Sequence, residues 1–254
     1  MKYRCLMPGS DCVQAVVFDF YGTLTVHATA ATRRKGADRV AEALGVAPDS
    51  FFDRLSATFT ERATGRRGDL AQTLAWVAQG CGREPSEEQL SAACAERRAV
   101  ETSFAEMLRP DAFATLSSLR ERGLRLGVIS DCTHELPEYW SRLSVAELVQ
   151  AVVFSVLVGE RKPHHSLYKL ACDALDVAPV DVVYVGDGGS NELSGAQAVG
   201  MTAVKLLADD AMDALVYDPE PAWAGHVIHS LSDLVTTTSA LLRPGRKDHG
   251  GPGR

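Results

Sequence analysis

The sequence predicts an open α/β fold, a doubly wound parallel sheet into which an all-helical segment is inserted. Three observations support this prediction. Short apolar runs rich in β-branched residues, typical of buried strands, recur along the chain. Helical patterns alternate with these runs, which is typical of a parallel sheet with helices on both faces. Between residues 28 and 106, however, only helical spacing is found.

The first strand is predicted at residues 13–18, where VQAVVF forms a short apolar run that ends at Asp19. A loop with the sequence Tyr21-Gly22-Thr23 follows it. The helical segment comes next, and its alanine-rich stretches are separated by glycines and Pro85. Helices are expected in it at 37–44, 51–59, 70–77 and 90–107.

The second half of the chain supplies the rest of the predicted sheet. Strands are expected at 124–129, 151–154, 181–185 and 202–206, with a last short strand at 227–228. Helices are predicted between them at 112–122, which stops at Gly123, and at 164–175. Ser190 is expected to cap the next helix, and one more helix closes the sheet.

The pattern divides the chain into two domains and a tail. The α/β core comprises residues 1–26 and 107–242, and the helical insert comprises residues 27–106. Residues 243–254 are rich in Gly, Lys and Arg and are expected to form a disordered tail.

Composition narrows the choice of partners. A formal net charge of −7 gives no basic field, so nucleic acid is not expected as a partner. No apolar run approaches the roughly 18 residues of a membrane helix, and the N-terminus does not resemble a signal peptide, so no membrane partner is expected. Six cysteines without a C-x-x-C pair predict neither a zinc site nor a disulfide framework. These features favour a cytoplasmic protein and leave its oligomeric state open.

Polar side chains follow four of the predicted strands or lie in the loops after them. They are Asp19, Ser130, Lys162 and Asp187. Ligands of such sheets bind outside the carboxyl ends of the strands, near the point where the strand order reverses. A carboxylate nucleophile, a hydroxyl, an ammonium and a second carboxylate are therefore expected to converge on one small site.

Four motifs, in order along the chain, resemble those of the haloacid dehalogenase superfamily. They are Asp19-Phe20-Tyr21-Gly22-Thr23-Leu24, Ile129-Ser130-Asp131, Arg161-Lys162-Pro163 and Val185-Gly186-Asp187-Gly188-Gly189-Ser190-Asn191-Glu192. The resemblance spans residues 13 to about 206, and the helical insert lies where that family carries its helical cap. Four ordered motifs are far more specific than any one of them. The resemblance implies a Rossmann-like hydrolase core with a cap domain.

The resemblance also implies a phosphatase mechanism. Asp19 would attack the phosphorus of a small phosphorylated metabolite and form an aspartyl-phosphate. Mg²⁺, held by Asp19, Asp187 and the backbone carbonyl of Tyr21, would offset the charge repulsion in this step. Glu192 and Asn191 would lie in the shell behind these ligands.

Further residues are implied to contact the substrate. Ser130 would donate a hydrogen bond to a phosphate oxygen, and Lys162 would neutralise charge in the transition state. The Gly22-Thr23 turn would bring backbone N–H groups towards the phosphate. Asp131 is another substrate-binding candidate. Arg62, in a basic run of the insert, either reaches towards an anionic substrate or belongs to a solvated helix end.

Tyr21 keeps other functions open. Phosphatases of this superfamily usually carry a second Asp at this position, as general acid and base. A similar Asp-x-Tyr-Gly-Thr-Leu motif occurs in 2-haloacid dehalogenases, in which the Asp attacks carbon and the departing halide needs no proton, so dehalogenation by Asp19 is one alternative. Those enzymes use no metal, and Asp187 and Glu192 therefore favour the phosphatase. A weakly active protein that binds a phosphorylated metabolite is the other alternative.

Overall fold

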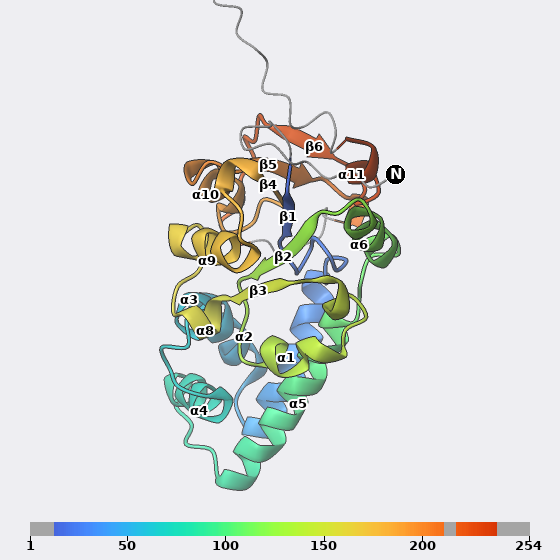
Figure 1. The fold of residues 1–254 in the computed structure, drawn as a ribbon. Coiled ribbons are helices and arrows are strands. Elements are labelled where there is room, and N and C mark those ends of the chain that lie inside the picture. The colour runs from blue at the N-terminus through green and yellow to red at the C-terminus, as the bar shows by residue number, and fades with distance from the viewer. Residues whose placement is uncertain (1–12, 211–216, 238–254) are drawn as a thin grey trace, which may run out of the picture.

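The computed structural model describes residues 13–210 and 217–237, and its centre is a six-stranded sheet (Figure 1). All strand pairs are parallel, in the order β3-β2-β1-β4-β5-β6. The strands are β1 (Ala15–Phe18), β2 (Arg125–Ser130), β3 (Ala151–Phe154), β4 (Val182–Gly186), β5 (Thr202–Leu206) and β6 (His226–Ile228). The predicted parallel sheet is confirmed. The tail predicted at 243–254 lies outside the described residues.

Helices cover both faces of the sheet, because successive side chains of a strand point to opposite faces. One face packs against α6 (Ala112–Glu121) and α11 (Asp233–Thr237), and the other against α9 (His165–Leu175) and α10 (Glu192–Ala198) (Figure 1). Within β1, Val16 and Phe18 belong to the first apolar cluster and Ala15 and Val17 to the second. The prediction of a doubly wound fold is therefore confirmed.

The strand order reverses at β1, which lies between β2 and β4. Phe18, the last residue of β1, pairs with Val128 of β2 and with Val185 of β4, so the three strands end at the same edge. Side chains that follow these strands meet there.

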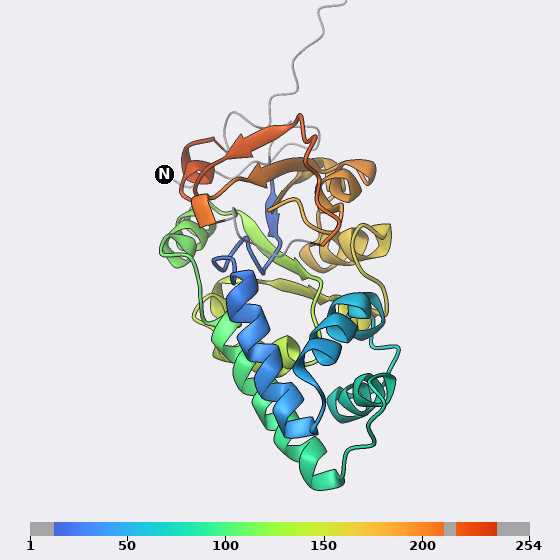
Figure 2. The ribbon, with the colours of Figure 1, turned by 180° about the vertical axis from the view of Figure 1, so that it is seen from behind.

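The chain between β1 and α6 forms five helices. They are α1 (Ala30–Leu44), α2 (Pro48–Ala57), α3 (Phe59–Ala63), α4 (Leu70–Gly80) and α5 (Glu87–Ala105). Their apolar side chains, among them Val40, Phe51 and Leu74, form a cluster of their own. Figures 1 and 2 show these helices gathered at the end of the molecule opposite β6. Thr25 and Leu108 form an isolated antiparallel bridge, so the two segments that join the helices to the sheet lie side by side.

Two of the helices predicted in this segment differ from the observed ones. α1 begins at Ala30, well before the expected residue 37, because the Thr29 hydroxyl accepts a hydrogen bond from the N–H of Thr32 and caps the helix. The helix predicted at 51–59 is instead two helices, α2 and α3, which meet at Thr58. The Thr58 hydroxyl donates to the carbonyl of Arg54 at 2.6 Å, and this local bond competes with a continuous helix.

Short elements complete the connections. They are α7 (Glu135–Tyr139), α8 (Ser155–Val158) and 3₁₀ helices at Trp140–Arg142, Ala146–Leu148 and Pro179–Asp181. The prediction that Ser190 caps a helix is wrong, because Asn191 is the residue before α10 and the Ser190 hydroxyl accepts from Arg161 Nη2 at 2.9 Å. Among the helices described at 13–210 and 217–237, none combines the length and apolar character needed to cross a membrane.

Candidate active site

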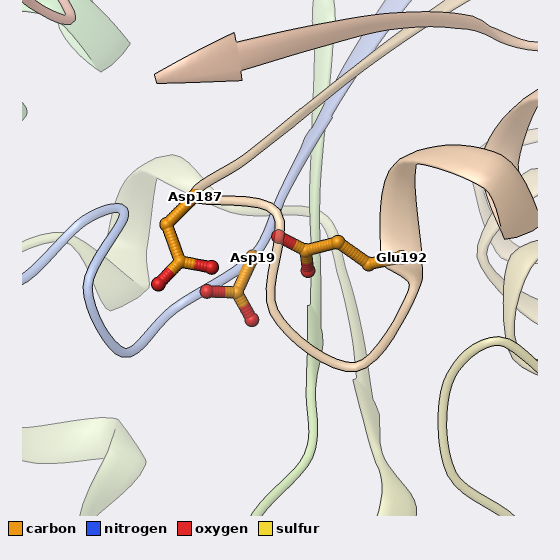
Figure 3. Close-up of side chains that lie close together, drawn as sticks. All are labelled: Asp19, Asp187 and Glu192. Carbon is orange, nitrogen blue, oxygen red and sulfur yellow. The ribbon is translucent and has the colours of Figure 1, made fainter. Parts of the chain in front are cut away.

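Three carboxylates meet at the edge where the strand order reverses (Figure 3). Asp19 follows β1, Asp187 follows β4, and Glu192 is the first residue of α10. One carboxylate oxygen from each residue lies within 4.8 Å of the other two. Asp19 is 5% exposed and Glu192 is 0% exposed. Because like charges repel strongly when they are close and shielded from water, this group requires positive charge.

Lys162 supplies one positive charge. Its Nζ donates to Asp19 Oδ1 at 2.5 Å and to Glu192 Oε2 at 2.5 Å. The backbone N–H of Lys162 donates to Asp131 Oδ1 at 3.0 Å, which fixes the loop that carries the ammonium. Burial opposes the charge of Lys162, but Asp19 and Glu192 outweigh it and raise the pKa of the ammonium well above its usual range. The ammonium therefore stays protonated.

One ammonium does not balance three carboxylates. Burial raises the pKa of the Asp19 carboxyl to about 6, against the opposing effect of Lys162. Burial likewise raises the pKa of Glu192 well above its usual range. For Asp187 burial also disfavours the charge, but hydrogen bonds with His27 and the N–H of Gly189, together with nearby charge, outweigh burial and lower the pKa. The group retains an excess of negative charge, which a bound cation would offset.

Both carboxylate oxygens of Glu192 are held by the protein. Tyr184 donates its hydroxyl to Oε2 at 2.8 Å, and the N–H of Gly188 donates to Oε1 at 3.0 Å. A side chain at Gly186 would exclude this arrangement, because a Cβ there would lie 2.0 Å from Oε1 of Glu192. Glu192 is therefore fixed in place beside Lys162.

The Gly22-Thr23 turn does not present the N–H groups that were expected to face a phosphate. The N–H of Gly22 donates to the Thr25 hydroxyl at 3.0 Å, and that of Thr23 donates to the carbonyl of Phe20 at 3.3 Å. Gly22 has a φ of 84°, and a Cβ at this position would lie 2.6 Å from His27 Nε2. The turn closes on itself, so the prediction is corrected: these two residues shape the loop behind Asp19.

Tyr21 lines the cavity in front of Asp19. Its hydroxyl donates to Glu101 Oε2 of α5 at 3.4 Å. Burial, followed by the nearby charge of Glu101, raises the pKa of Tyr21 well above 10.0. Arg97 pairs with the same Glu101 at 2.8 Å, which completes a buried polar network around the phenol. Tyr21 is therefore neutral at physiological pH and contacts a carboxylate.

Three other predicted site residues are Ser130, Asp131 and Asn191. Ser130 ends β2 and is 1% exposed. Asp131 lines the cavity, but both its carboxylate oxygens are in use, since Oδ1 accepts from Lys162 and Oδ2 from Arg161 Nε at 3.2 Å. Asp131 thus holds the loop of Lys162, and its contact with substrate stays a prediction. Asn191 is exposed, and its place behind the ligands stays a prediction.

A cavity of about 140 Å³ lies in front of Asp19. Its floor includes Lys162 and Asp187, and its roof is formed by α1, α2, α3 and α5. Three arginines, Arg33, Arg62 and Arg97, stand among the aromatic side chains of the roof. Arg62 was predicted as either a substrate contact or a solvated residue; it is buried and lines the cavity.

His27 is the residue that sequence reasoning missed. Its Nε2 lies 2.9 Å from Asp187 Oδ2, and its backbone N–H donates to Asp210 Oδ2 at 2.7 Å. The His27 side chain is 6% exposed, so this contact with Asp187 is shielded from water. Its position shortly after the first motif is the one signal that could have pointed to it.

Arg161, also missed, joins the roof of the cavity to the loop of Lys162. Its Nη1 donates to the Thr60 hydroxyl of α3 at 3.0 Å, and its guanidinium lies 5.3 Å from the ring centre of Phe59. The same side chain pairs with Asp131 at 3.2 Å. Arg161 thus connects the helical roof to the loop of Lys162.

Comparison with known proteins identifies the family of this fold and site. Residues 13–200 match the family model described as haloacid dehalogenase-like hydrolase, so the chain belongs to that family. It is 28% identical to glyceraldehyde 3-phosphate phosphatase of Methanopyrus kandleri, over 76% of this chain and 84% of that protein. It is 27% identical to (S)-2-haloacid dehalogenase 1 of a Pseudomonas species, over 92% of this chain and 98% of that protein.

Other relatives match over a shorter region. Haloacid dehalogenase-like hydrolase domain-containing protein 3 of Mus musculus is 32% identical over 50% of each chain, so the match spans half the length of that relative. Among solved structures, 2-haloacid dehalogenase from Pseudomonas syringae pv. tomato superposes with a TM-score of 0.65 at 23% identity, covering 90% of this chain and 98% of that one. This structural likeness supports the fold.

Proposed function

We propose that the protein is a Mg²⁺-dependent phosphatase that hydrolyses a small phosphate monoester, with Asp19 as nucleophile. The observation that carries the proposal is the buried group of Asp19, Asp187 and Glu192, whose negative charge exceeds that of its single ammonium partner. A phosphatase needs a divalent cation at this place, because an anionic nucleophile must approach an anionic phosphoryl group. The phosphatase relatives are consistent with this choice.

The residues present fit Mg²⁺ better than a softer metal. All donors of the group are oxygen atoms, which Mg²⁺ prefers, and Cys or His ligands that would favour zinc are not part of it. Asp19, Asp187 and the backbone carbonyl of Tyr21 would hold the ion, while Glu192 stays with Lys162. When bound, the ion would screen the repulsion between Asp19 and the phosphoryl oxygens.

The chain's own side chains then divide the reaction into two displacements. The Asp19 carboxylate attacks phosphorus and forms an aspartyl-phosphate, and the P–O bond to the leaving alcohol breaks. Water then attacks this acyl phosphate, which releases inorganic phosphate and regenerates Asp19. The Lys162 ammonium, 2.5 Å from Asp19 Oδ1, is placed to stabilise the charge that develops on the phosphoryl oxygens in both steps, and Ser130 is proposed to donate to one of them.

Residues 27–106 would act as a cap domain over the core of residues 1–26 and 107–242. Their separate apolar cluster and the adjacent linkers at Thr25 and Leu108 support this division. The roof residues of the cavity belong to this segment, so it would hold the leaving group of a small cytoplasmic metabolite. Four free cysteines in the described part of the chain are consistent with a reducing compartment.

Dehalogenation of a 2-haloacid is the second candidate, and Tyr21 favours it. A dehalogenase relative also matches over most of this chain. In that reaction Asp19 would attack carbon, and the halide would leave without a proton donor. The acidic group argues against dehalogenation. That reaction has no anionic phosphoryl group whose repulsion from Asp19 a cation would offset, so it gives no reason for a cation-binding group. A weakly active protein that binds a phosphorylated metabolite is the third possibility.

A paired screen separates the three candidates. Phosphate release from a panel of phosphate esters and halide release from 2-haloacids would each be measured with Mg²⁺ and with a chelator. The proposal predicts phosphate release that is lost on chelation. Halide release from 2-chloropropionate in chelator, without phosphate release from any ester, would establish the dehalogenase. Binding of esters without turnover of either class would establish the binding protein.

A further inference from the structure

Two arginines in the roof of the cavity have no acidic partner in the described part of the chain. Arg62 is 6% exposed, its Nη2 donates to the Leu55 carbonyl at 2.8 Å, and its Nε has no hydrogen-bond partner. The Nε of Arg33 is also buried without a partner, and its guanidinium lies 5.6 Å from the ring centre of Phe104. Buried polar atoms are normally hydrogen-bonded, so these two Nε atoms require an explanation.

Arg97, the third arginine of the roof, provides the contrast. It forms ion pairs with Glu101 at 2.8 Å and with Glu135 at 2.6 Å. Both of these ion pairs are made by Arg97, whereas neither Arg33 nor Arg62 forms an ion pair with a carboxylate in the described part of the chain. Burial, followed by the charge of Arg97, lowers the pKa of Arg62 to about 10, which still leaves its guanidinium protonated at neutral pH. The roof therefore carries an excess of positive charge.

This positive roof faces the nucleophile across a small space. The same cavity is lined by Asp19 and Lys162 at its floor and by Arg33 and Arg62 at its roof. Its volume of about 140 Å³ is below the roughly 300–1,000 Å³ of pockets for drug-sized ligands. The far end of a short ester whose phosphoryl group lies at Asp19 would thus be close to the roof.

We infer that the substrate carries a second anionic group, a carboxylate or a phosphate, and that Arg62 and Arg33 bind it. The inference rests on the proposed phosphatase function and narrows its substrate class to short-chain esters with an anion at each end. A guanidinium donates hydrogen bonds to either anion in a planar, forked geometry. Such a group would supply the acceptors that the two buried Nε atoms lack.

Matched substrate pairs test this inference. With Mg²⁺ present, kcat/KM would be measured for 3-phosphoglycerate against glycerol 3-phosphate, and for 1,3-propanediol bisphosphate against 3-hydroxypropyl phosphate. The members of each pair share a carbon chain and differ in the second anion. In one of the two pairs, we expect kcat/KM to be at least about tenfold higher for the substrate that carries the second anion. The pair that shows this difference identifies the second anion as a carboxylate or a phosphate. 4-Nitrophenyl phosphate, which has no second anion, reports phosphatase function independently.

Variants connect the preference to the roof. Arg62→Met keeps the length and the apolar contacts of the side chain but removes its charge, and it should reduce the preference within the favoured pair by about 10- to 100-fold. Arg33→Met should reduce the same preference, and because Arg33 is only partly buried it serves if Arg62→Met does not fold. Arg66→Met is the matched control, since Arg66 is exposed and is not among the residues lining the cavity.

The outcomes separate this inference from the function on which it rests. Equal kcat/KM values within both pairs, or an Arg62→Met variant that retains the wild-type preference, would overturn the inference. Turnover of 4-nitrophenyl phosphate in that same experiment would leave the proposed phosphatase intact. No turnover of any ester would reject both.

Discussion

Replacing Tyr21 tests how the second half of the proposed reaction proceeds. The Tyr21 hydroxyl donates to Glu101 Oε2 at 3.4 Å, and burial, followed by Glu101, raises its pKa well above 10.0. A phenol of this kind is not available as a base for the water that hydrolyses an aspartyl-phosphate. Hydrolysis of the acyl phosphate should therefore limit turnover. Tyr21→Asp supplies a carboxylate at this position, and Tyr21→Phe, its control, removes only the hydroxyl.

The expected change in turnover of Tyr21→Asp follows from the fraction of each side chain that is ionised. With a pKa above 10.0, fewer than about one Tyr21 in 1,000 is ionised at pH 7. An Asp is mostly ionised at this pH even when its surroundings raise its pKa by about two units. General base catalysis contributes about 10²- to 10⁴-fold. Because Glu101 would repel a new carboxylate, we expect Tyr21→Asp to reach only the lower part of this range, about 10- to 100-fold in steady-state turnover. Tyr21→Phe should stay within about threefold of wild type.

Stopped-flow release of nitrophenolate from 4-nitrophenyl phosphate measures both half-reactions. The wild type should show a burst followed by slow turnover, and Tyr21→Asp should turn over faster with a smaller burst. A wild type without a burst, together with slower turnover of Tyr21→Asp, would refute the reasoning. Another group would then activate water, or the natural reaction would not be phosphoryl transfer.

Three other substitutions have defined outcomes. Lys162→Met removes the ammonium between two buried carboxylates, so urea titration should show a free energy of unfolding lower by about 3–5 kcal/mol. The value of kcat should fall at least about 100-fold, and an unchanged kcat would contradict the role of Lys162. His27→Gln should weaken Mg²⁺ binding in calorimetry by about 10- to 100-fold, because His27 Nε2 holds Asp187 at 2.9 Å, and equal affinity would refute this. Burial raises the pKa of Glu135, but the charge of Arg97 and hydrogen bonds together outweigh burial and lower this pKa below 4.5. Its stabilising contribution is therefore present above about pH 4.5 and is lost as the pH falls through the folded-state pKa. The stability difference between wild type and Glu135→Gln should thus be largest near pH 7 and shrink below about pH 4 in urea titrations, and a difference independent of pH would contradict it.

The sheet and the residues at its edge could be predicted from the sequence because both depend on local patterns. A β-branched apolar run such as 13–18 has few alternatives to a buried strand. Parallel strands end at a common edge, so Asp19 and Asp187 had to lie close together once their strands were recognised. Lys162 reaches the same place because its loop follows β3 and α8, and the carboxyl end of β3 lies at the same edge of the parallel sheet.

Contacts between distant segments could not be predicted in this way. Glu101 reaches Tyr21 from the far end of the helical insert, across 80 residues of sequence, and no periodicity encodes that approach. His27 was missed for a related reason, since its contact with Asp187 depends on how tightly the turn at Gly22 folds back. The left-handed backbone at Asn191, with a φ of 49°, and the exposure of its side chain also follow from how the loop folds and not from the motif.

Mass spectrometry of the peptide that carries Asp19 tests the central claim most directly. The enzyme would be quenched in acid during turnover of 4-nitrophenyl phosphate, with Asp19→Asn and chelator as controls. The account predicts one phosphoryl group on Asp19 in the presence of Mg²⁺ and none in either control. Turnover with an unmodified Asp19, or a carbon adduct on Asp19 formed from 2-chloropropionate in chelator, would contradict it.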